Sequence, residues 1–276
     1  IKKGIQKIPI KKKGHFAIKV DATVSKIRPY VTGIIATNGK LDDLSIKQLM
    51  NMQEDLHFGI GRKRKKSSIG IHDLDKISFP LLYTATNKSH EFTPLHSEKT
   101  LSISEIITNT DLGKEYGSIL GNSTKVPIIL DSNKQTVSFP PIINASVTTV
   151  TTKTKNLFVE VTGINKNDAE DMLSVVATIL QKAGFVLEIV HIFGAKNSTP
   201  KLEQNKISVT PELINQTLGL NLKTSKIISS LKKSRLDASS KGKQIICTIP
   251  AYRFDIFGPM DLVEETALGY GIQNLE

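Results

Sequence analysis

The feature that most constrains the fold is a long amphipathic helix pattern at residues 167–183, which lies between two apolar runs. The apolar positions that follow the 3.6-residue helical period are Ala169, Met172, Leu173, Val176, Ile179, Leu180 and Ala183. Residues 155–161 and 185–192 are predicted strands, and Gly163 and Gly184 separate them from the helix. A strand–helix–strand order combined with hairpins predicts a mixed sheet that is covered by helices.

Other periodic segments extend this first domain. The predicted elements are strands at 16–20, 30–36 and 67–71, helices at 42–56 and 102–107, and a hairpin of 126–130 with 136–139. Pro140-Pro141 ends the second strand of the hairpin, because proline cannot donate to a strand ladder.

A second, smaller domain follows a linker at residues 194–205, which are rich in Gly, Ser, Asn, Pro and Lys. Cap and breaker residues then predict helices at 210–219 and 224–234, a strand at 243–249 and a helix that begins near Asp261. We therefore expect an α+β chain. A mixed-sheet domain packed with helices would occupy residues 1–200, and a winged-helix-like module would occupy residues 206–276.

The positive charge is concentrated in the first quarter of the chain. Of the 276 residues, the first 66 carry 16 Lys or Arg against 5 Asp or Glu, which accounts for the whole net charge of +11. Most of these cations lie in a basic lead-in at residues 2–13 and in a run of five at residues 62–66. The run predicts a mobile phosphate-binding loop, because Arg offers a bidentate fork and Lys a point charge. A solubilising loop is the alternative, and the spacing of a Walker loop is absent.

Composition excludes several classes of protein. No apolar run approaches the ~20 residues of a membrane helix, so we expect no membrane partner. The single cysteine, Cys247, rules out an internal disulfide and a cysteine zinc site, and it falls in a predicted strand as a buried thiol. One cysteine and no signal peptide indicate the cytosol, and the absence of an initial methionine suggests a fragment.

Four carboxylates gather near the end of the chain, where Asp255, Asp261, Glu264 and Glu265 lie within eleven residues. The last three stand at i, i+3 and i+4 of the predicted helix, so they would share one face. A site for a hard divalent cation with oxygen ligands is one interpretation. The other is a helix start, because Asp261-x-x-Glu264 resembles a capping box and acids are favoured in a first turn.

The sequence around these acids resembles the end of the small tRNA-synthetase module of phenylalanyl-tRNA synthetase β subunits. The matching residues are Arg253-Phe-Asp255-Ile256 and Asp261-Leu-Val-Glu264-Glu265-Thr-Ala-Leu-Gly-Tyr270-Gly271. The resemblance implies that the four carboxylates form a magnesium (Mg²⁺) site shared with the α subunit. Gly269 departs from the family, where a larger residue is common.

The first two hundred residues are similar to the archaeal and eukaryotic form of the same subunit. The matching strings are Gly61-Arg-Lys-Arg-Lys65, Ile69-Gly-Ile-His72-Asp73-Leu-Asp75-Lys76, Ser138-Phe-Pro-Pro-Ile-Ile-Asn144 and Thr154-Lys-Asn156-Leu-Phe-Val-Glu160-Val-Thr162-Gly163. In this family the domain is an editing domain that hydrolyses tyrosine wrongly esterified to the phenylalanine tRNA. An apolar synthetic pocket rejects an added hydroxyl by only ~10²-fold, so a second site that hydrogen-bonds the hydroxyl can select for it.

The resemblance implies that Glu160 accepts a hydrogen bond from the hydroxyl of tyrosine. Thr162 would lie on the same side of the strand and Ser138 on an opposing segment, as further residues of the editing pocket. Archaeal members usually have Asp in place of Glu160, so the carboxyl of this chain reaches one methylene further. The residues expected to hold the terminal adenosine and the phosphates of tRNA are His57, Arg62, Lys63 and Arg64.

No Ser-His-Asp arrangement is evident in the sequence. His72 and Asp73 are adjacent on a predicted strand and would point to opposite faces, so a structural histidine is expected. Hydrolysis would therefore use a water activated by positioning or by the ribose hydroxyl of the substrate, and no protein nucleophile.

The resemblance implies a fragment of the β subunit of phenylalanine–tRNA ligase. The whole enzyme would be a cytoplasmic heterotetramer with α subunits that attaches phenylalanine to tRNA(Phe) using ATP. The motifs of a class II synthetic core are absent, so this piece is not expected to make aminoacyl-adenylate. Two alternatives stay open: a non-catalytic module that binds tRNA and docks the α subunit, and an unrelated basic RNA-binding protein.

Overall fold

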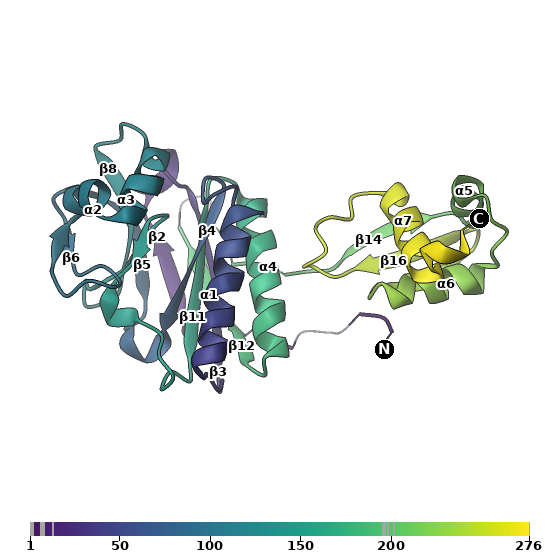
Figure 1. Cartoon of the computed structure of the whole chain (residues 1–276), viewed down its shortest axis with the longest axis horizontal. Helices are drawn as coiled ribbons and strands as arrows, with labels where there is room; N and C mark the ends of the chain where they lie inside the picture. The colour runs from purple at the N-terminus through teal and green to yellow at the C-terminus, as the bar shows by residue number, and fades with distance from the viewer. Residues whose placement is uncertain are drawn as a thin grey trace. The chain divides into compact units, whose positions relative to one another are not determined.

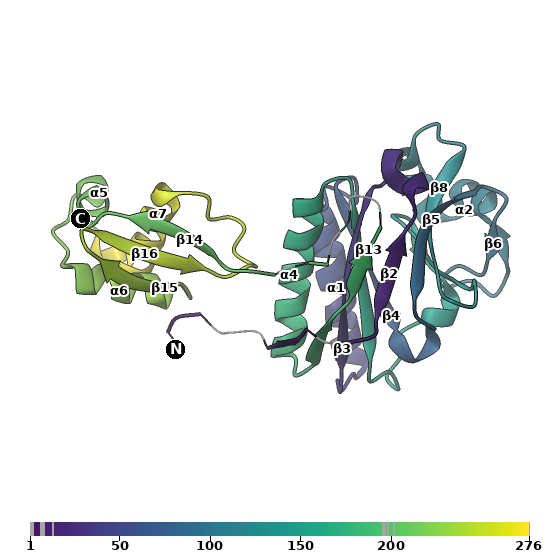
Figure 2. The same ribbon diagram turned by 180° about the vertical axis from the view of Figure 1, so that it is seen from behind.

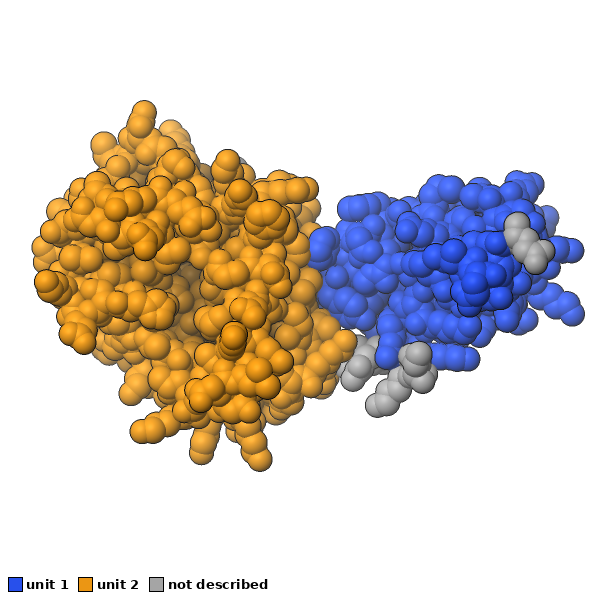
Figure 3. Space-filling view, in the orientation of Figure 1, with its two compact units in different colours: residues 1–8, 202–276 blue, residues 9–201 orange. Residues whose placement is uncertain are grey.

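The computed structural model describes residues 3–5, 9–12, 14–194, 197, 199–200 and 202–275. Contacts within the chain divide it into two units, one of residues 9–201 and one of residues 202–276 together with residues 1–8 (Figure 3). The sequence placed residues 1–8 with the first domain, whereas the contacts group them with the second unit. Gly4 N–H donates to the carbonyl of Lys232 at 2.8 Å, and Ile5 N–H donates to Asp237 Oδ1 at 3.1 Å. The rest of the basic lead-in and of the linker falls partly outside the described residues.

A five-stranded sheet forms the centre of the larger unit. Its strands, in spatial order, are β1 (Ile10–Lys11), β12 (Val186–Ile189), β3 (Tyr30–Thr37), β11 (Leu157–Gly163) and β4 (Ser67–Asp73). β11 is antiparallel to both of its neighbours, β3 and β4. Helices α1 (Asp43–Phe58) and α4 (Lys166–Lys182) lie side by side over one face of this sheet (Figures 1 and 2).

A six-stranded sheet packs against the other face. Its order is β10 (Ile143–Asn144), β9 (Thr136–Phe139), β8 (Lys125–Leu130), β5 (Leu81–Asn87), β2 (Ala17–Val20) and β13 (His191–Phe193). The core between the two sheets includes Ile18, Val31, Tyr83 and Phe158. A separate core that includes Ile106, Ile128 and Phe139 joins the six-stranded sheet to α2 (Ile103–Asn109). Close to α2 are α3 (Asp111–Tyr116) and the two-stranded sheet of β6 (Glu91–Phe92) and β7 (Leu101–Ser102).

The smaller unit is a three-stranded antiparallel sheet with three helices. The strands are β14 (Asn205–Val209), β16 (Gln244–Ile249) and β15 (Asp237–Lys241), in that spatial order, and the helices are α5 (Pro211–Leu218), α6 (Thr224–Lys233) and α7 (Pro259–Tyr270). Its core contains Ile214, Leu231 and Leu262. Cys247 is a free, buried thiol in this core, as expected, and burial raises its pKa to about 12.

The expected α+β class is confirmed, and the differences lie at particular elements. The hairpin is β8 with β9, as predicted, and α4 lies within two residues of its predicted bounds. The apolar run 185–192 was expected to be one strand, but it divides into β12 and β13, which join different sheets. The sequence did not predict α3, β14 or β15, and 3₁₀ turns occur at Ala22–Lys26, Leu74–Lys76, Gly117–Leu120, Ser146–Thr148 and Ile272–Asn274. None of the helices in the described part of the chain has the length and apolar character needed to cross a bilayer.

Candidate functional site

Glu160 lies on β11 at the centre of the five-stranded sheet, on the face that packs against the second sheet. In the two neighbouring strands the residues opposite Glu160 are both glycines, Gly33 on β3 and Gly70 on β4. A Cβ atom at Gly70 would lie 2.6 Å from Glu160 Oε1, so only glycine leaves room for the carboxyl group. The two glycines therefore leave the space in the sheet that the carboxyl group of Glu160 occupies.

The carboxyl group of Glu160 is buried, with 2% of the residue exposed. Its Oε1 accepts a hydrogen bond of 2.9 Å from Ser138 Oγ. Oε2 has no hydrogen-bond partner among the residues that the structure describes. Burial raises the pKa of Glu160 to about 7, although the bond from Ser138 and the charge of Arg28 act in the opposite direction. An unpaired buried carboxyl oxygen is costly, so this group is poised to accept a ligand.

Glu160 lines a hollow of about 270 Å³, whose walls include α1, β4 and the segment that runs from the end of β9 to β10. α1 contributes Met50, Gln53 and Glu54, and β4 contributes Ser68 and Ile69. The other described lining residues are Arg64, Leu95, His96, Leu112 and the segment from Phe139 to Asn144. Nine of the sixteen lining side chains are apolar, which suits an aromatic ring, and the other seven are polar or charged.

Ser138 and Thr162, the other two residues predicted for the editing pocket, lie in different surroundings. Ser138 reaches Glu160 from β9 and fixes its carboxyl group, although Ser138 is not itself among the lining residues. Thr162 is not among the lining residues of this hollow, and its role in an editing pocket stays a prediction. Its hydroxyl accepts from Arg28 Nε at 2.8 Å and lies 3.1 Å from Ser68 Oγ. Thr162 therefore belongs to a buried network that lies beside the hollow.

Two of the four residues expected to bind tRNA, His57 on α1 and Arg64 in the basic run, are buried. His57 is buried, and its Nε2 accepts from the backbone N–H of Ile69 at 2.8 Å, so its Nδ1 carries the hydrogen and faces Glu54 at 3.3 Å. Burial lowers the pKa of His57, which keeps the ring neutral. Arg64 is also buried, pairs with Glu54 at 2.9 Å and donates to the carbonyls of Pro141 and Ile142. Both residues already have partners in the interior, and their contact with tRNA stays a prediction.

The turn that carries these cations has an unusual backbone. Arg62, Lys63 and Arg64 have φ angles of 49°, 53° and 64°, all in the left-handed region. Such a conformation costs roughly 1–2 kcal/mol per residue, so it persists only where surrounding contacts fix it. The bonds of Arg64 to the 141–142 segment provide that support and also fix one wall of the hollow. Arg62 and Lys63 stay exposed, and their contact with tRNA stays a prediction.

His72 and Asp73 do not form a dyad. His72 stacks on Phe158 with ring centroids 5.7 Å apart, and its Nδ1 lies 2.9 Å from Thr148 Oγ1. Asp73 accepts from Thr154 Oγ1 at 2.8 Å instead. Nε2 of His72 lacks a described partner, and it lies 2.6 Å from the point that a Gly70 Cβ would occupy. The same point is 2.6 Å from Glu160 Oε1 and 3.1 Å from Asn144 Oδ1, so three polar groups converge over Gly70.

Three of the four carboxylates of the smaller unit accept hydrogen bonds within the protein. Arg253 donates from Nε and Nη2 to both oxygens of Asp255, at 2.7–3.1 Å, and from Nη2 to Glu265 Oε1. These bonds lower the pKa of Asp255. Asp261 Oδ2 accepts from the N–H groups of Phe257 and Gly258 at 2.7 and 2.8 Å. Asp261 therefore lies in the first turn of the helix, as expected, but the N-cap residue is Gly258, so Asp261-x-x-Glu264 is not the capping box. Asp261, Glu264 and Glu265 all lie on α7 at the predicted i, i+3 and i+4 positions, but Glu264 is exposed and Glu265 is buried.

Two family models match this chain. The B3/4 domain matches residues 18–174, and the tRNA synthetase B5 domain matches residues 207–272. The chain is also similar to the phenylalanine–tRNA ligase beta subunit of Methanosphaera stadtmanae, with 38% identity over 280 residues that cover 100% of this chain and 50% of the relative. The corresponding subunit of Sulfurisphaera tokodaii is 40% identical over 250 residues, which cover 90% of this chain and 46% of the relative.

A solved structure decides the family. The chain aligns with an N-terminal fragment of the phenylalanyl-tRNA synthetase beta subunit from Pyrococcus horikoshii with a TM-score of 0.94 and 32% identity, over 98% of this chain and 78% of that fragment. This chain belongs to the phenylalanyl-tRNA synthetase β-subunit family. It spans about half the length of the subunits from Methanosphaera stadtmanae and Sulfurisphaera tokodaii.

A magnesium site in this β-subunit chain is implied by the family and stays a prediction. No cluster of three or more potential metal ligands occurs in the part of the chain that the structure describes. Asp255 and Glu265 are engaged by Arg253, and Asp261 by backbone N–H groups. A Mg²⁺ ion at these carboxylates would compete with those hydrogen bonds, whereas Glu264 is exposed.

Proposed function

We propose that this chain is the editing part of a phenylalanine–tRNA ligase β subunit and that it hydrolyses tyrosine from mischarged tRNA(Phe). The observation that carries the proposal is the unpartnered Oε2 of Glu160 beside a hollow of about 270 Å³. The hydroxyl of tyrosine would supply the missing hydrogen-bond partner. Phenylalanine would leave the buried oxygen unpaired, which costs about 1–3 kcal/mol.

The chemistry of the hollow favours attack by water. Hydrolysis adds water to the ester carbonyl, breaks the bond to the ribose oxygen, and returns a proton to that oxygen. Ser68 is the one hydroxyl side chain among the described lining residues, and its Oγ is already engaged with Arg28 and Thr162. A covalent acyl intermediate on this serine is therefore disfavoured, and positioning of water and of the substrate's own ribose hydroxyl supports the reaction.

In the whole enzyme, we expect this part to act beside the α subunit in a cytoplasmic heterotetramer that charges tRNA(Phe). Arg62 and Lys63 are exposed and are the candidates for contact with tRNA phosphates. Their replacement should weaken tRNA binding and reduce its dependence on salt.

A deacylation assay tests the editing proposal. Purified chain should release tyrosine from Tyr-tRNA(Phe) faster than phenylalanine from Phe-tRNA(Phe). Glu160→Ala should reduce this preference by about tenfold or more, because a hydrogen bond to a charged or buried partner is lost. Glu91→Ala is the matched control, since Glu91 is exposed on β6 and does not line the hollow. Intact tRNA binding with no release above background would contradict the proposal.

A docking module for a protein partner is the second candidate function. Phe257 is 83% exposed, and the large apolar side chains of Met260, Leu268 and Ile272 around α7 are also exposed. Clustered apolar side chains on a surface indicate a protein contact, and the α subunit is the partner that the family offers. The docking function alone predicts that Phe257→Ser weakens association with the α subunit and that the chain has no deacylation activity.

A further inference from the structure

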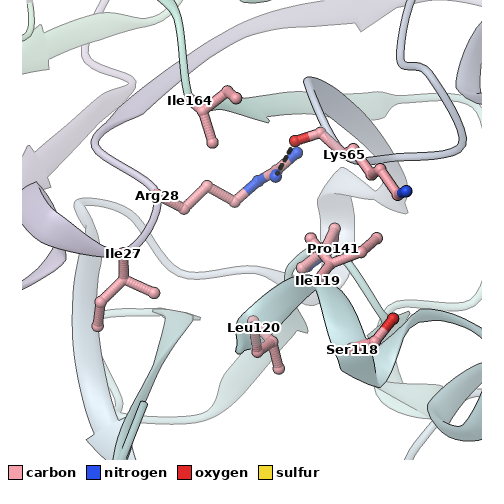
Figure 4. A pocket seen from close by; sticks show the side chains of 8 residues that line it. All are labelled: Ile27, Arg28, Lys65, Ser118, Ile119, Leu120, Pro141 and Ile164. Carbon is pink, nitrogen blue, oxygen red and sulfur yellow. Dashed lines mark hydrogen bonds between the residues drawn. The ribbon is translucent and has the colours of Figure 1, made fainter. Parts of the chain in front are cut away.

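A second hollow of about 370 Å³ lies in the larger unit, beside the Glu160 hollow. The two hollows share Pro141, and no other described lining residue is common to them. The side chains that line the second hollow are Ile27, Arg28, Lys65, Ser118, Ile119, Leu120, Pro141 and Ile164 (Figure 4). The lining therefore combines an apolar wall with two cations, and it contains no acid.

Arg28 is the group that makes this hollow unusual. The residue is 2% exposed, and no carboxylate pairs with it among the described residues. Burial lowers its pKa to about 10, which still leaves the guanidinium charged at neutral pH. The charge of Glu160 acts on Arg28 without a direct ion pair between the two side chains. A buried charge that is only partly compensated is expensive, so its retention beside a hollow points to an anionic ligand.

The hydrogen bonds of Arg28 satisfy Nε and Nη2 of the guanidinium, but they leave Nη1 with an incomplete set of acceptors. Nε donates to Thr162 Oγ1 at 2.8 Å, and Nη2 donates to Ser68 Oγ at 3.2 Å and to the carbonyl of Thr162 at 2.9 Å. Nη1 makes one long contact of 3.5 Å, with the carbonyl of Lys65. Since Nη1 carries two hydrogens, at least one has no described acceptor. Figure 4 shows the guanidinium reaching toward Lys65, with Ile119, Leu120 and Pro141 across from it.

The rim of the hollow adds a second charge and a hydroxyl. Lys65 and Ser118 are both exposed and both line the hollow. A phosphate group carries more negative charge than a carboxylate, and Arg with Lys is the pair of side chains that recognises it best. The volume exceeds what a phosphate alone would fill and falls in the range of small-molecule sites.

We propose that this second hollow binds the phosphate of a nucleotide, with Arg28 Nη1 and Lys65 on the phosphate and the apolar wall against the base. The site is distinct from the Glu160 hollow. Binding of a free mononucleotide does not require hydrolysis of an ester, so the proposal can fail or hold independently of the editing function.

Calorimetry with the 276-residue chain and three probes, AMP, adenosine and inorganic phosphate, tests the site. AMP should bind about tenfold more tightly than adenosine, which lacks the charge-assisted hydrogen bonds of the phosphate. AMP should also bind more tightly than inorganic phosphate, which cannot use the apolar wall. Adenosine binding as tightly as AMP would overturn the phosphate assignment, and equal binding of phosphate and AMP would overturn the assignment of a nucleotide.

Variants locate the binding without relying on Arg28, whose replacement could unfold the larger unit. Ile164 is 52% exposed, so Ile164→Trp should be tolerated and should fill the hollow, weakening AMP binding about tenfold or more. Lys65→Ala should weaken it severalfold. Lys26→Ala removes an equal charge from an exposed residue that does not line the hollow, and it should leave AMP affinity unchanged. Failure of wild-type chain to bind AMP at millimolar concentration, or equal affinity in Ile164→Trp and wild type, would refute the proposal.

Discussion

The buried carboxyl group of Glu160 should make the stability of this protein depend on pH in an unusual direction. Burial raises its pKa from the ordinary value of 4.5 to about 7. A carboxyl whose pKa is higher in the folded state stabilises the fold fully below the unfolded pKa and loses that stabilisation as pH rises through the folded pKa. The difference between the two pKa values corresponds to about 3 kcal/mol of unfolding free energy, lost between roughly pH 4.5 and pH 7.

Glu160→Gln tests this reasoning, because glutamine keeps the length of the side chain and an oxygen for Ser138 but cannot titrate in this range. We expect the unfolding free energy of wild type, relative to that of Glu160→Gln, to fall by about 3 kcal/mol from pH 4 to pH 8. Urea unfolding followed by NMR signals of the larger unit gives this difference without interference from the smaller unit. Glu91→Gln, which changes an exposed glutamate, should show no such trend. A pH-independent difference for Glu160→Gln, or a carboxyl ¹³C signal of Glu160 that titrates near pH 4.5, would refute the reasoning.

Three further predictions concern the contacts around the Glu160 hollow and around the carboxylates of the smaller unit. Gly70→Ala should destabilise the larger unit by about 1–3 kcal/mol in urea unfolding and slow tyrosine release, because its Cβ would displace the Glu160 carboxyl group. Glu54→Gln should cost about 1–2 kcal/mol, since it weakens the pairing of buried Arg64. Hydrogen bonding to His57 and the charge of Arg64 lower the pKa of Glu54 to about 2, so wild type should lose this advantage as pH falls from 4.5 toward 2. Arg253→Met should free two carboxylates, and added Mg²⁺ should then raise the melting temperature of this variant more than that of wild type.

Hydrophobic periodicity predicted the elements whose environment is uniform along their length. α4 buries one continuous stripe against the five-stranded sheet, so its pattern alone defined it. Residues 185–192 show the limit of the method. They form one apolar run, but the chain passes from one sheet to the other at Val190, a buried residue between β12 and β13. Nothing in a continuous apolar run marks such a change of partner.

The errors in the candidate sites involve charged and polar side chains. Arg64 and His57 were expected to contact tRNA, but both are buried, and a left-handed turn directs Arg64 inward to Glu54. No residue of the run signals that turn, because it contains no glycine after Gly61. Glu160 was found through the resemblance alone. A local signal did exist in Gly70, since a glycine inside a strand marks a close approach of another group.

The position of Glu160 on a strand that is hydrogen-bonded on both sides has a consequence for how the proposed editing specificity could diversify. The carboxyl group cannot follow a ligand that fits badly, because the backbone that bears it belongs to the stiffest layer of the molecule. On the proposed function, adaptation to other amino acids would come from the less buried lining residues, Ile143–Asn144 and the Leu95–His96 loop, because Phe139 and Ile142 belong to a buried core. Directed evolution of substrate range should accumulate its changes in those two segments and leave β11 untouched.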